Sequence, residues 1–275
     1  MAPEVDGAKI GLRPVASLLP HEETIPAKSE KLYLDMKKEK IQRDPMIVDY
    51  ESGTVLDGMH RLSAFKKMKA EYAVCHLVDY SSPSVTLERW LRVYKVGRKE
   101  LVPSILENLG LSQKVPLTDI FDLVEKREVA LGVIAPDGCH VARADGPAVA
   151  SGFALVRRLD SVFSTMGWGM SFTGEDEIDV ATQDSKNMVV LTPKVNKQDV
   201  LNAARSGQLL PWKTTMHVVD PRPVAIDFPL ADLMKPSPPS SELEALLREG
   251  GRKLTPPDTI YKGRRYKERL LVLRG

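Results

Sequence analysis

The five residues Asp57-Gly58-Met59-His60-Arg61, which we call the DGMHR turn, decide how the first part of this chain is interpreted. They follow an apolar run, Thr54-Val55-Leu56, that is typical of a β-strand. After the turn, apolar residues recur at helical spacing, at Leu62, Phe65 and Met68. The pattern predicts a strand that ends at Asp57, a tight turn at Gly58 and a helix that begins near Met59.

A strand-to-helix turn of this kind can bind an anion. The free backbone N–H groups at a helix start and the helix dipole both attract phosphate. His60 and Arg61 would add charge-assisted donors at the same place. The turn does not match the Walker pattern, and the chain has no GxGxxG. Because aspartate and glycine are common at strand-to-helix connections, Asp57 could instead serve only as a helix N-cap.

Composition narrows the class of protein. The chain is 43% hydrophobic and 28% charged, which is typical of a soluble globular protein. A net charge of +2 is too small to recruit nucleic acid through a global field, although basic residues gather after Arg248. Cys75 and Cys139 lack CxxC spacing, which argues against a zinc or dithiol site. With no membrane-length apolar run and no hydrophobic signal peptide, we expect a cytoplasmic protein without a membrane partner.

Strand and helix signals alternate along the chain and predict an α/β (α+β) fold. We expect a first domain over residues 1–96 and a second α/β domain over 97–234. The sequence Lys-Pro-Ser-Pro-Pro-Ser-Ser at 235–241 is typical of a linker, so we assign 235–275 as a linker followed by a basic extension.

Three further clusters carry polar chemistry. A glutamate in Pro20-His21-Glu22-Glu23 could act as a general base, although paired glutamates often only face solvent. The hydroxyls, cation and imidazole of Lys213-Thr214-Thr215-Met216-His217 could bind a ligand with amino and carboxylate groups, or lie on the exposed face of a strand. Trp90 could be a ligand platform or a core residue. The absence of GxSxG and HExxH removes support for serine-hydrolase and zinc-protease chemistry.

Taken together, these clusters resemble the free L-serine kinases, which are built on the ParB/sulfiredoxin-like fold. The DGxHR element alone is shared with ParB-type partition proteins, whereas the early HE pair and the later KTTxH element narrow the choice to the kinases. The matching motifs run from about residue 9 to about residue 233: Pro20-His21-Glu22, the DGMHR turn, Asp79-Tyr80, Trp90, Lys197-Gln198-Asp199-Val200, Ser206-Gly207, Lys213 to Val218, Pro221 and Pro223.

The resemblance implies an activity and a division of labour between the domains. The family phosphorylates the hydroxyl of free serine to give O-phospho-L-serine, a precursor for cysteine synthesis, with ATP or ADP as donor and Mg²⁺ as cofactor. Residues 1–96 would be the ParB/sulfiredoxin-like nucleotide-binding domain. Residues 97–234 would form a cleft with it and complete the serine pocket.

The resemblance also assigns residue roles. Glu22 would be the general base, and Asp57 would lie close to Mg²⁺ or the reacting centre. The nucleotide phosphates would be held by Asp57, Gly58, Met59, His60 and Arg61. The serine pocket would be lined by Trp90, Lys213, Thr214, Thr215 and His217. Family members often have histidine where Met59 stands, which removes one side-chain phosphate contact and leaves the backbone N–H as a donor.

Two rival classes share parts of this pattern. A ParB-like, nucleotide-dependent DNA-binding protein is favoured by the DGxHR element and the basic tail, but the chain lacks a clear helix-turn-helix and is nearly neutral. A sulfiredoxin-like reductase needs a reactive cysteine at the DGMHR turn, which has none. The sequence leaves open the choice of ATP or ADP, the oligomeric state, the role of 235–275 and the selectivity for serine over threonine or homoserine.

Overall fold

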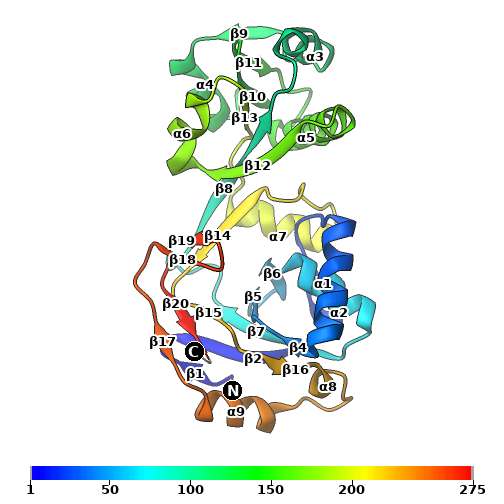
Figure 1. Cartoon of the computed structure of the whole chain (residues 1–275), viewed down its shortest axis with the longest axis vertical. Coiled ribbons are helices and arrows are strands. Elements are labelled where there is room, and N and C mark those ends of the chain that lie inside the picture. Colours follow the sequence, from blue (N-terminus) through cyan, green and yellow to red (C-terminus); the bar gives the residue numbers. More distant parts are fainter. Residues whose placement is uncertain (1, 274–275) are drawn as a thin grey trace. The chain divides into compact units, whose positions relative to one another are not determined.

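The structure of the protein is a computed structural model that describes residues 2–273. Arg274, which we counted in the basic extension, lies outside the described residues. The chain forms two compact units (Figure 1). The first unit contains residues 1–87, 197–212 and 217–275, and the second contains residues 88–196 and 213–216.

A six-stranded mixed sheet forms the centre of the first unit. Its strands lie in the order β1 (Glu4–Val5), β2 (Ala8–Pro14), β7 (Tyr72–Val78), β5 (Met46–Asp49), β6 (Thr54–Asp57) and β3 (Leu19–Pro20). A 3₁₀ turn over Val15–Ser17 follows β2. The helices α1 (Pro26–Glu39) and α2 (Met59–Met68) pack against each other (Figure 1). Val48, Val55, Phe65 and Val74 belong to their common apolar core.

The chain returns to the first unit after residue 196 and builds its remaining elements there, except that residues 213–216, which include the first two residues of β14, belong to the second unit. These are α7 (Lys197–Ser206), β14 (Thr215–Val219), β15 (Arg222–Val224), β16 (Phe228–Pro229), α8 (Leu230–Leu233), α9 (Ser240–Glu249), β17 (Lys253–Leu254), β18 (Thr259–Tyr261), β19 (Arg264–Tyr266) and β20 (Leu270–Val272). Strand β16 pairs with β4 (Ile41–Gln42), and β15, β20 and β17 form a three-stranded sheet.

The C-terminal extension is part of the first unit's core. Its helix α9 packs along β2 (Figure 1), and its leucines lie in the same apolar cluster as Val55 and Phe65. The leucines of this segment in that cluster are Leu243, Leu246, Leu247, Leu271 and Leu273. The extension is therefore held by hydrophobic burial, although its composition suggested a linker and a basic tail.

The second unit contains an antiparallel sheet covered on both faces. Its strands lie in the order β12 (Gly169–Gly174), β8 (Val85–Lys95), β13 (Asn187–Leu191), β10 (Leu131–Ala135), β11 (Gly138–Ala142) and β9 (Gln113–Val115), and β14 also pairs with β8. Its helices are α3 (Val102–Asn108), α4 (Leu117–Glu125), α5 (Ala148–Thr165) and α6 (Ile178–Gln183), with 3₁₀ turns over Lys99–Leu101 and Glu175–Glu177. Met188 and Val190 face the core shared with α3 and α5, whereas Val189 and Leu191 face the core shared with α4.

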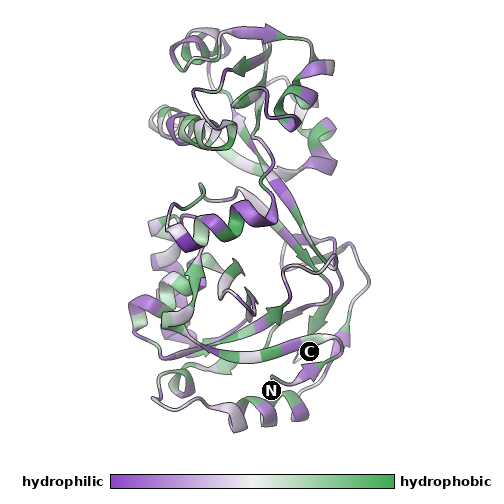
Figure 2. Cartoon of the chain, turned by 180° about the vertical axis from the view of Figure 1, so that it is seen from behind, coloured by the Kyte–Doolittle hydropathy of each residue, from purple (hydrophilic) through white to green (hydrophobic). Residues whose placement is uncertain are grey.

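The hydropathy of the helices agrees with this layering. Figure 2 shows hydrophobic residues alternating with hydrophilic ones along the helices, as expected when one face of a helix is buried. None of the helices within residues 2–273 is long and apolar enough to cross a membrane.

The residue ranges of the two units differ from the predicted domain ranges of 1–96, 97–234 and 235–275. The reason is that strands from distant parts of the chain complete both units: α7 and everything after β14 lie with the N-terminal sheet, and residues 213–216 lie with the second unit. A division read along the sequence assumes contiguous domains and cannot anticipate such a return.

Candidate active site

The DGMHR turn has the predicted geometry. Strand β6 ends at Asp57, and Gly58 is the N-cap of α2 with φ of 111°. A Cβ atom at position 58 would lie 2.9 Å from Cγ of Met46 and 3.0 Å from Nε of Arg61, so glycine is required for both conformation and space. The predicted strand, turn and helix are confirmed. The alternative role of Asp57 as the N-cap is wrong, because Gly58 holds that position without a side-chain cap.

Parallel strand pairing brings Glu22 to the level of Asp57. Strand β3 runs parallel to β6, with Pro20 opposite Val55. Two residues farther along the two segments stand Glu22 and Asp57, at the same edge of the sheet. Both carboxylates act electrostatically on the buried His21. The predicted base and the predicted phosphate-binding turn therefore belong to the same unit and are both close enough to His21 to act on its charge.

The segment around Glu22 is fixed by its backbone and by His21. The N–H of Leu210 donates to the carbonyl of His21 (2.9 Å), and the N–H of Glu23 donates to the carbonyl of Leu210 (2.8 Å). Nδ1 of His21 lies 2.7 Å from the carbonyl oxygen of Val55, which assigns the proton to Nδ1. Nε2 then faces Oε1 of Glu22 at 3.8 Å. Burial lowers the pKa of His21 against the opposing effect of Glu22, so the ring is neutral near pH 7.

A second buried histidine, His217, packs against the first. The two rings meet edge to face, with centroids 5.4 Å apart. Nε2 of His217 lies 2.8 Å from the hydroxyl of Tyr80, within hydrogen-bond distance. Burial raises the pKa of Tyr80, so its hydroxyl keeps its proton. Burial and the neighbouring His21 lower the pKa of His217 well below its ordinary value, so His217 is also neutral. Nζ of Lys197 lies over the Tyr80 ring, 5.2 Å from its centroid.

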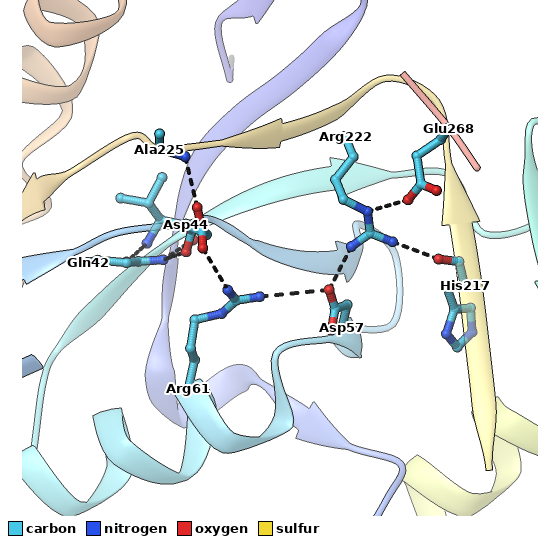
Figure 3. A network of polar contacts seen from close by, with 9 residues as sticks. Gln42, Asp44, Asp57, Arg61, His217, Arg222, Ala225 and Glu268 are labelled. Carbon is cyan, nitrogen blue, oxygen red and sulfur yellow. Dashed lines mark hydrogen bonds and ion pairs between the residues drawn. The ribbon is translucent and has the colours of Figure 1, made fainter. Parts of the chain in front are cut away.

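The carboxylate of Asp57 belongs to a network of alternating charges (Figure 3). It accepts a hydrogen bond of 2.6 Å from Nη1 of Arg222. Arg61 lies between Asp57 and Asp44, at 3.9 Å and 3.7 Å, which is beyond hydrogen-bond distance. Oδ1 of Asp44 accepts from the N–H of Ala225 (2.8 Å). Arg61 is thus placed beside the turn but not held by short bonds to either carboxylate.

The other members of the turn have structural contacts as well. Nε2 of His60 accepts a hydrogen bond of 3.2 Å from the N–H of Ile25, the N-cap of α1, and so ties the turn to that helix. The side chain of Met59 is buried in the apolar core, so only its backbone can face a ligand. Where family members often have a histidine that can contact phosphate, this chain has a methionine that packs into the core.

The predicted serine-pocket residues of the second unit lie together. Nζ of Lys213 lies 4.3 Å from the ring centroid of Trp90, and the backbone N–H of Trp90 donates to the carbonyl of Thr214 (3.4 Å). Thr214 and Thr215 are buried, so the alternative of hydroxyls on an exposed strand face is wrong. His217, the last member of the cluster, belongs to the first unit.

Sequence reasoning did not name Tyr80 and Arg222 as site residues. Tyr80 stood inside a motif of the resemblance, and Arg222 stands between the two prolines Pro221 and Pro223 that were named. The available signal for Arg222 was a charged residue directly before the apolar residues Pro223 to Ile226. Within residues 2–273, no group of three or more His, Cys, Asp or Glu side chains could hold a metal ion by itself.

No protein-family profile matches the chain. Two curated relatives are similar over most of their lengths. An ATP-dependent L-serine kinase from Staphylothermus marinus is 23% identical over 231 residues, which cover 80% of this chain and 89% of the relative. An ADP-dependent L-serine kinase from Thermococcus kodakarensis is 22% identical over 227 residues, which cover 78% and 88%.

Solved structures show the same fold. A free serine kinase in complex with AMP has a TM-score of 0.69 and 20% identity, and covers 82% of this chain and 93% of that one. A variant free serine kinase in complex with ADP has a TM-score of 0.71 and 20% identity, with 84% and 95% covered. A truncated SbnI from Staphylococcus aureus has a TM-score of 0.67 and 14% identity, with 86% and 93% covered. The predicted α/β fold class and the resemblance to the free L-serine kinases are both confirmed.

Proposed function

We propose that this protein is a free L-serine kinase that uses ATP or ADP to make O-phospho-L-serine. The observation that supports the proposal is the parallel pairing of β3 with β6: Glu22 follows β3 by two residues, and Asp57 ends β6 at the start of α2. A carboxylate base next to an anion-binding helix start is what phosphoryl transfer to a hydroxyl requires. The identity of the substrate is inferred from the two relatives that are named as L-serine kinases. Phosphoserine formed in this way would be available for cysteine synthesis.

In the proposed reaction, the serine hydroxyl oxygen attacks the terminal phosphorus of the nucleotide. The new O–P bond forms as the bridging O–P bond breaks, and the shortened nucleotide leaves. Glu22 accepts the hydroxyl proton. Neutral His21 places no cation beside Glu22 that would weaken it as a base, and its Nδ1 hydrogen bond to Val55 keeps the ring in place.

The phosphates would lie at the DGMHR turn. The hydrogen-bond donors to the phosphates would be the backbone N–H groups at the start of α2 and the guanidinium of Arg61. Both would stabilise the negative charge of the phosphates and form no covalent bond. Because Arg61 makes no short bond to Asp44 or Asp57, it can turn toward a phosphate at little cost.

The residues present fit a magnesium ion that arrives with the nucleotide. Proteins usually bind Mg²⁺ through one or two carboxylates together with substrate phosphates and water, so the lack of a three-ligand cluster within the described chain is compatible with it. Asp57 would hold the ion. When bound, Mg²⁺ supplies neutralisation of the charge on the phosphates.

Serine recognition is assigned to Trp90, Lys213, Thr214, Thr215 and His217. The support is the family motif, together with the contacts of Lys213 and Thr214 to Trp90 and the burial of both threonines. Neutral His217 would offer an uncharged ring to the ligand, oriented by Tyr80.

The test is direct. The protein is incubated with serine, Mg²⁺ and either ADP or ATP, and phosphoserine is measured by mass spectrometry with threonine and homoserine as control acceptors. We expect phosphoserine with at least one donor. No phosphoserine with either donor would contradict the proposal, and salt-sensitive DNA binding in its place would favour the ParB-like alternative.

The role of Glu22 is tested with a neighbouring control. Glu22→Gln should retain nucleotide affinity and lose about 10²–10⁴-fold in turnover, because the proton acceptor is removed. Glu23→Gln removes the same charge one residue away and should change turnover by less than about threefold. Equal activity of the two variants would remove Glu22 from the base role.

A further inference from the structure

The C-terminal extension contributes one charged side chain, Glu268, to the network around the DGMHR turn (Figure 3). Glu268 and Arg222 are only 6% and 4% exposed, and Nε of Arg222 donates to Oε1 of Glu268. The other two edges of the guanidinium are also used. Nη1 donates to Asp57 and Nη2 donates to the carbonyl of His217, each at 2.6 Å. Arg222 therefore joins the extension to two residues of the proposed active site.

Strand pairing explains why Glu268 reaches Arg222. Strand β20 runs parallel to β15 with Leu270 opposite Arg222, and the N–H of Arg222 donates to the carbonyl of Arg269 (2.9 Å). Glu268 precedes Leu270 by two residues and so lies at the same end of the pair as Arg222. The ring of Tyr266, also from the extension, covers the guanidinium at 5.8 Å.

A buried guanidinium keeps its charge and its planar fork, so its orientation is set by the carboxylates around it. Burial opposes the charged form of Arg222, but Asp57 and Glu268 together outweigh it and raise the pKa of the side chain. Without Glu268, the only remaining carboxylate that Arg222 contacts among the described residues would be Asp57. The fork would then turn toward Asp57 and lose the geometry that holds Asp57 at the end of β6.

We infer that Glu268 is a positioning residue that acts through Arg222 to fix the orientation of Asp57 at the phosphate-binding turn. The inference rests on the proposed function. Glu268 lies beyond the stretch from about residue 9 to about residue 233 that carries the family motifs, so the resemblance gives it no role. The extension is thus part of the catalytic unit as well as part of the core.

Glu268→Gln is the test variant, because glutamine keeps the shape and one acceptor while it removes the charge. Asp258→Asn is the matched control: it removes one charge from the same extension, where Asp258 pairs with the exposed Arg265. Turnover and KM are measured with serine and the active donor. Hydrogen exchange is followed by mass spectrometry in the peptide that covers residues 54–62, with and without nucleotide.

We expect Glu268→Gln to lower kcat about tenfold or more with little change in the KM for serine, as is usual when a group that orients a site residue is lost. Exchange in the 54–62 peptide should be faster than in Asp258→Asn. When Glu268→Gln is combined with Asp57→Asn, it should lower kcat by less than about twofold beyond the effect of Asp57→Asn alone. The reason is that Glu268 acts on turnover only through the Asp57 carboxylate. Additive losses would mean that Glu268 supports only the fold.

The possible failures can be told apart. A wild-type protein that makes no phosphoserine refutes the proposed function, and the exchange comparison alone then decides the positioning role. An active wild type with Glu268→Gln equal to Asp258→Asn in turnover or in exchange overturns the inference. If Glu268→Gln does not fold, Arg222→Lys, which keeps the charge but loses the fork, replaces it under the same criteria.

Discussion

Replacement of Gly58 by alanine tests whether the geometry of the DGMHR turn serves nucleotide binding. Alanine at φ of 111° enters the left-handed region, which costs about 1–2 kcal/mol. Its Cβ would also lie 2.9 Å from Cγ of Met46 and 3.0 Å from Nε of Arg61, and overpacking of this kind costs about 1–3 kcal/mol more. The methyl group thus destabilises the turn and displaces the guanidinium that we assign to the phosphates.

Gly110→Ala is the matched control. Gly110 also has a positive φ of 82°, but apart from the glycine and its two chain neighbours no described heavy atom lies within 4 Å of the position that its Cβ would take. Gly110→Ala should therefore lose about 1–2 kcal/mol of stability with unchanged nucleotide affinity. The difference between the two variants isolates the effect of crowding Met46 and Arg61 from the effect of backbone strain.

The assay is calorimetric titration with ADP and ATP, combined with urea unfolding of both variants. Loss of one charge-assisted hydrogen bond to phosphate is worth about 1.5–3 kcal/mol, so Gly58→Ala should weaken nucleotide binding about ten- to a hundredfold. If Gly58→Ala binds nucleotide as tightly as Gly110→Ala and unfolds at the same urea concentration, the proposed role of the turn is refuted.

Three further predictions concern the substrate, the metal and pH. Thr215→Val should raise the KM for serine about tenfold and leave ADP affinity unchanged, because one buried hydrogen-bonding hydroxyl is lost; an unchanged KM would exclude Thr215 from the pocket. Removal of Mg²⁺ with EDTA should abolish turnover and restoration of Mg²⁺ should recover it, whereas full activity in EDTA would contradict a metal-assisted reaction. Burial lowers the pKa of His76 to about 4, so the unfolded state binds a proton before the folded state does, and stability falls as pH drops from 6.5 toward 4. His76 should account for about 2 kcal/mol of the decrease in the free energy of unfolding between pH 6.5 and 5, measured by urea unfolding. If this free energy depends on pH equally in the wild type and in His76→Gln, His76 is not responsible for the decrease.

Local sequence rules were sufficient for the DGMHR turn. The positive φ of Gly58 and the helical spacing after it are properties of adjacent residues, and both are visible without tertiary contacts. The early HE pair and the KTTxH element were likewise found as short motifs. What they share is that each can be recognised within about five neighbouring residues.

Strand β8 was not predicted, and buried charge explains why. Arg89 and Arg92 lie in the middle of this strand and are only 3% and 1% exposed. Arg89 pairs with Glu125 and Glu175, and Arg92 with Asp160, all of them far along the chain. Because charged side chains are seldom buried without such partners, the sequence alone hides the strand's inward-facing positions.

The same limit applies to Arg222 and Glu268. They are 46 residues apart, and Asp57 is 165 residues from Arg222, so no local pattern joins them. Only the pairing of β15 with β20 makes them neighbours. For the same reason the extension, assigned as a linker with a basic tail, was not expected to reach the candidate site.

In the proposed reaction, a serine hydroxyl oxygen attacks the terminal phosphate of a nucleotide held at the DGMHR turn. Serine labelled with ¹⁸O in its side chain, incubated with the active donor and Mg²⁺, tests it in one mass spectrum. We expect phosphoserine that retains the label in its ester oxygen, formed at a rate that falls steeply in Glu22→Gln. Unlabelled phosphoserine, or no phosphoserine while the nucleotide is still consumed, would contradict it.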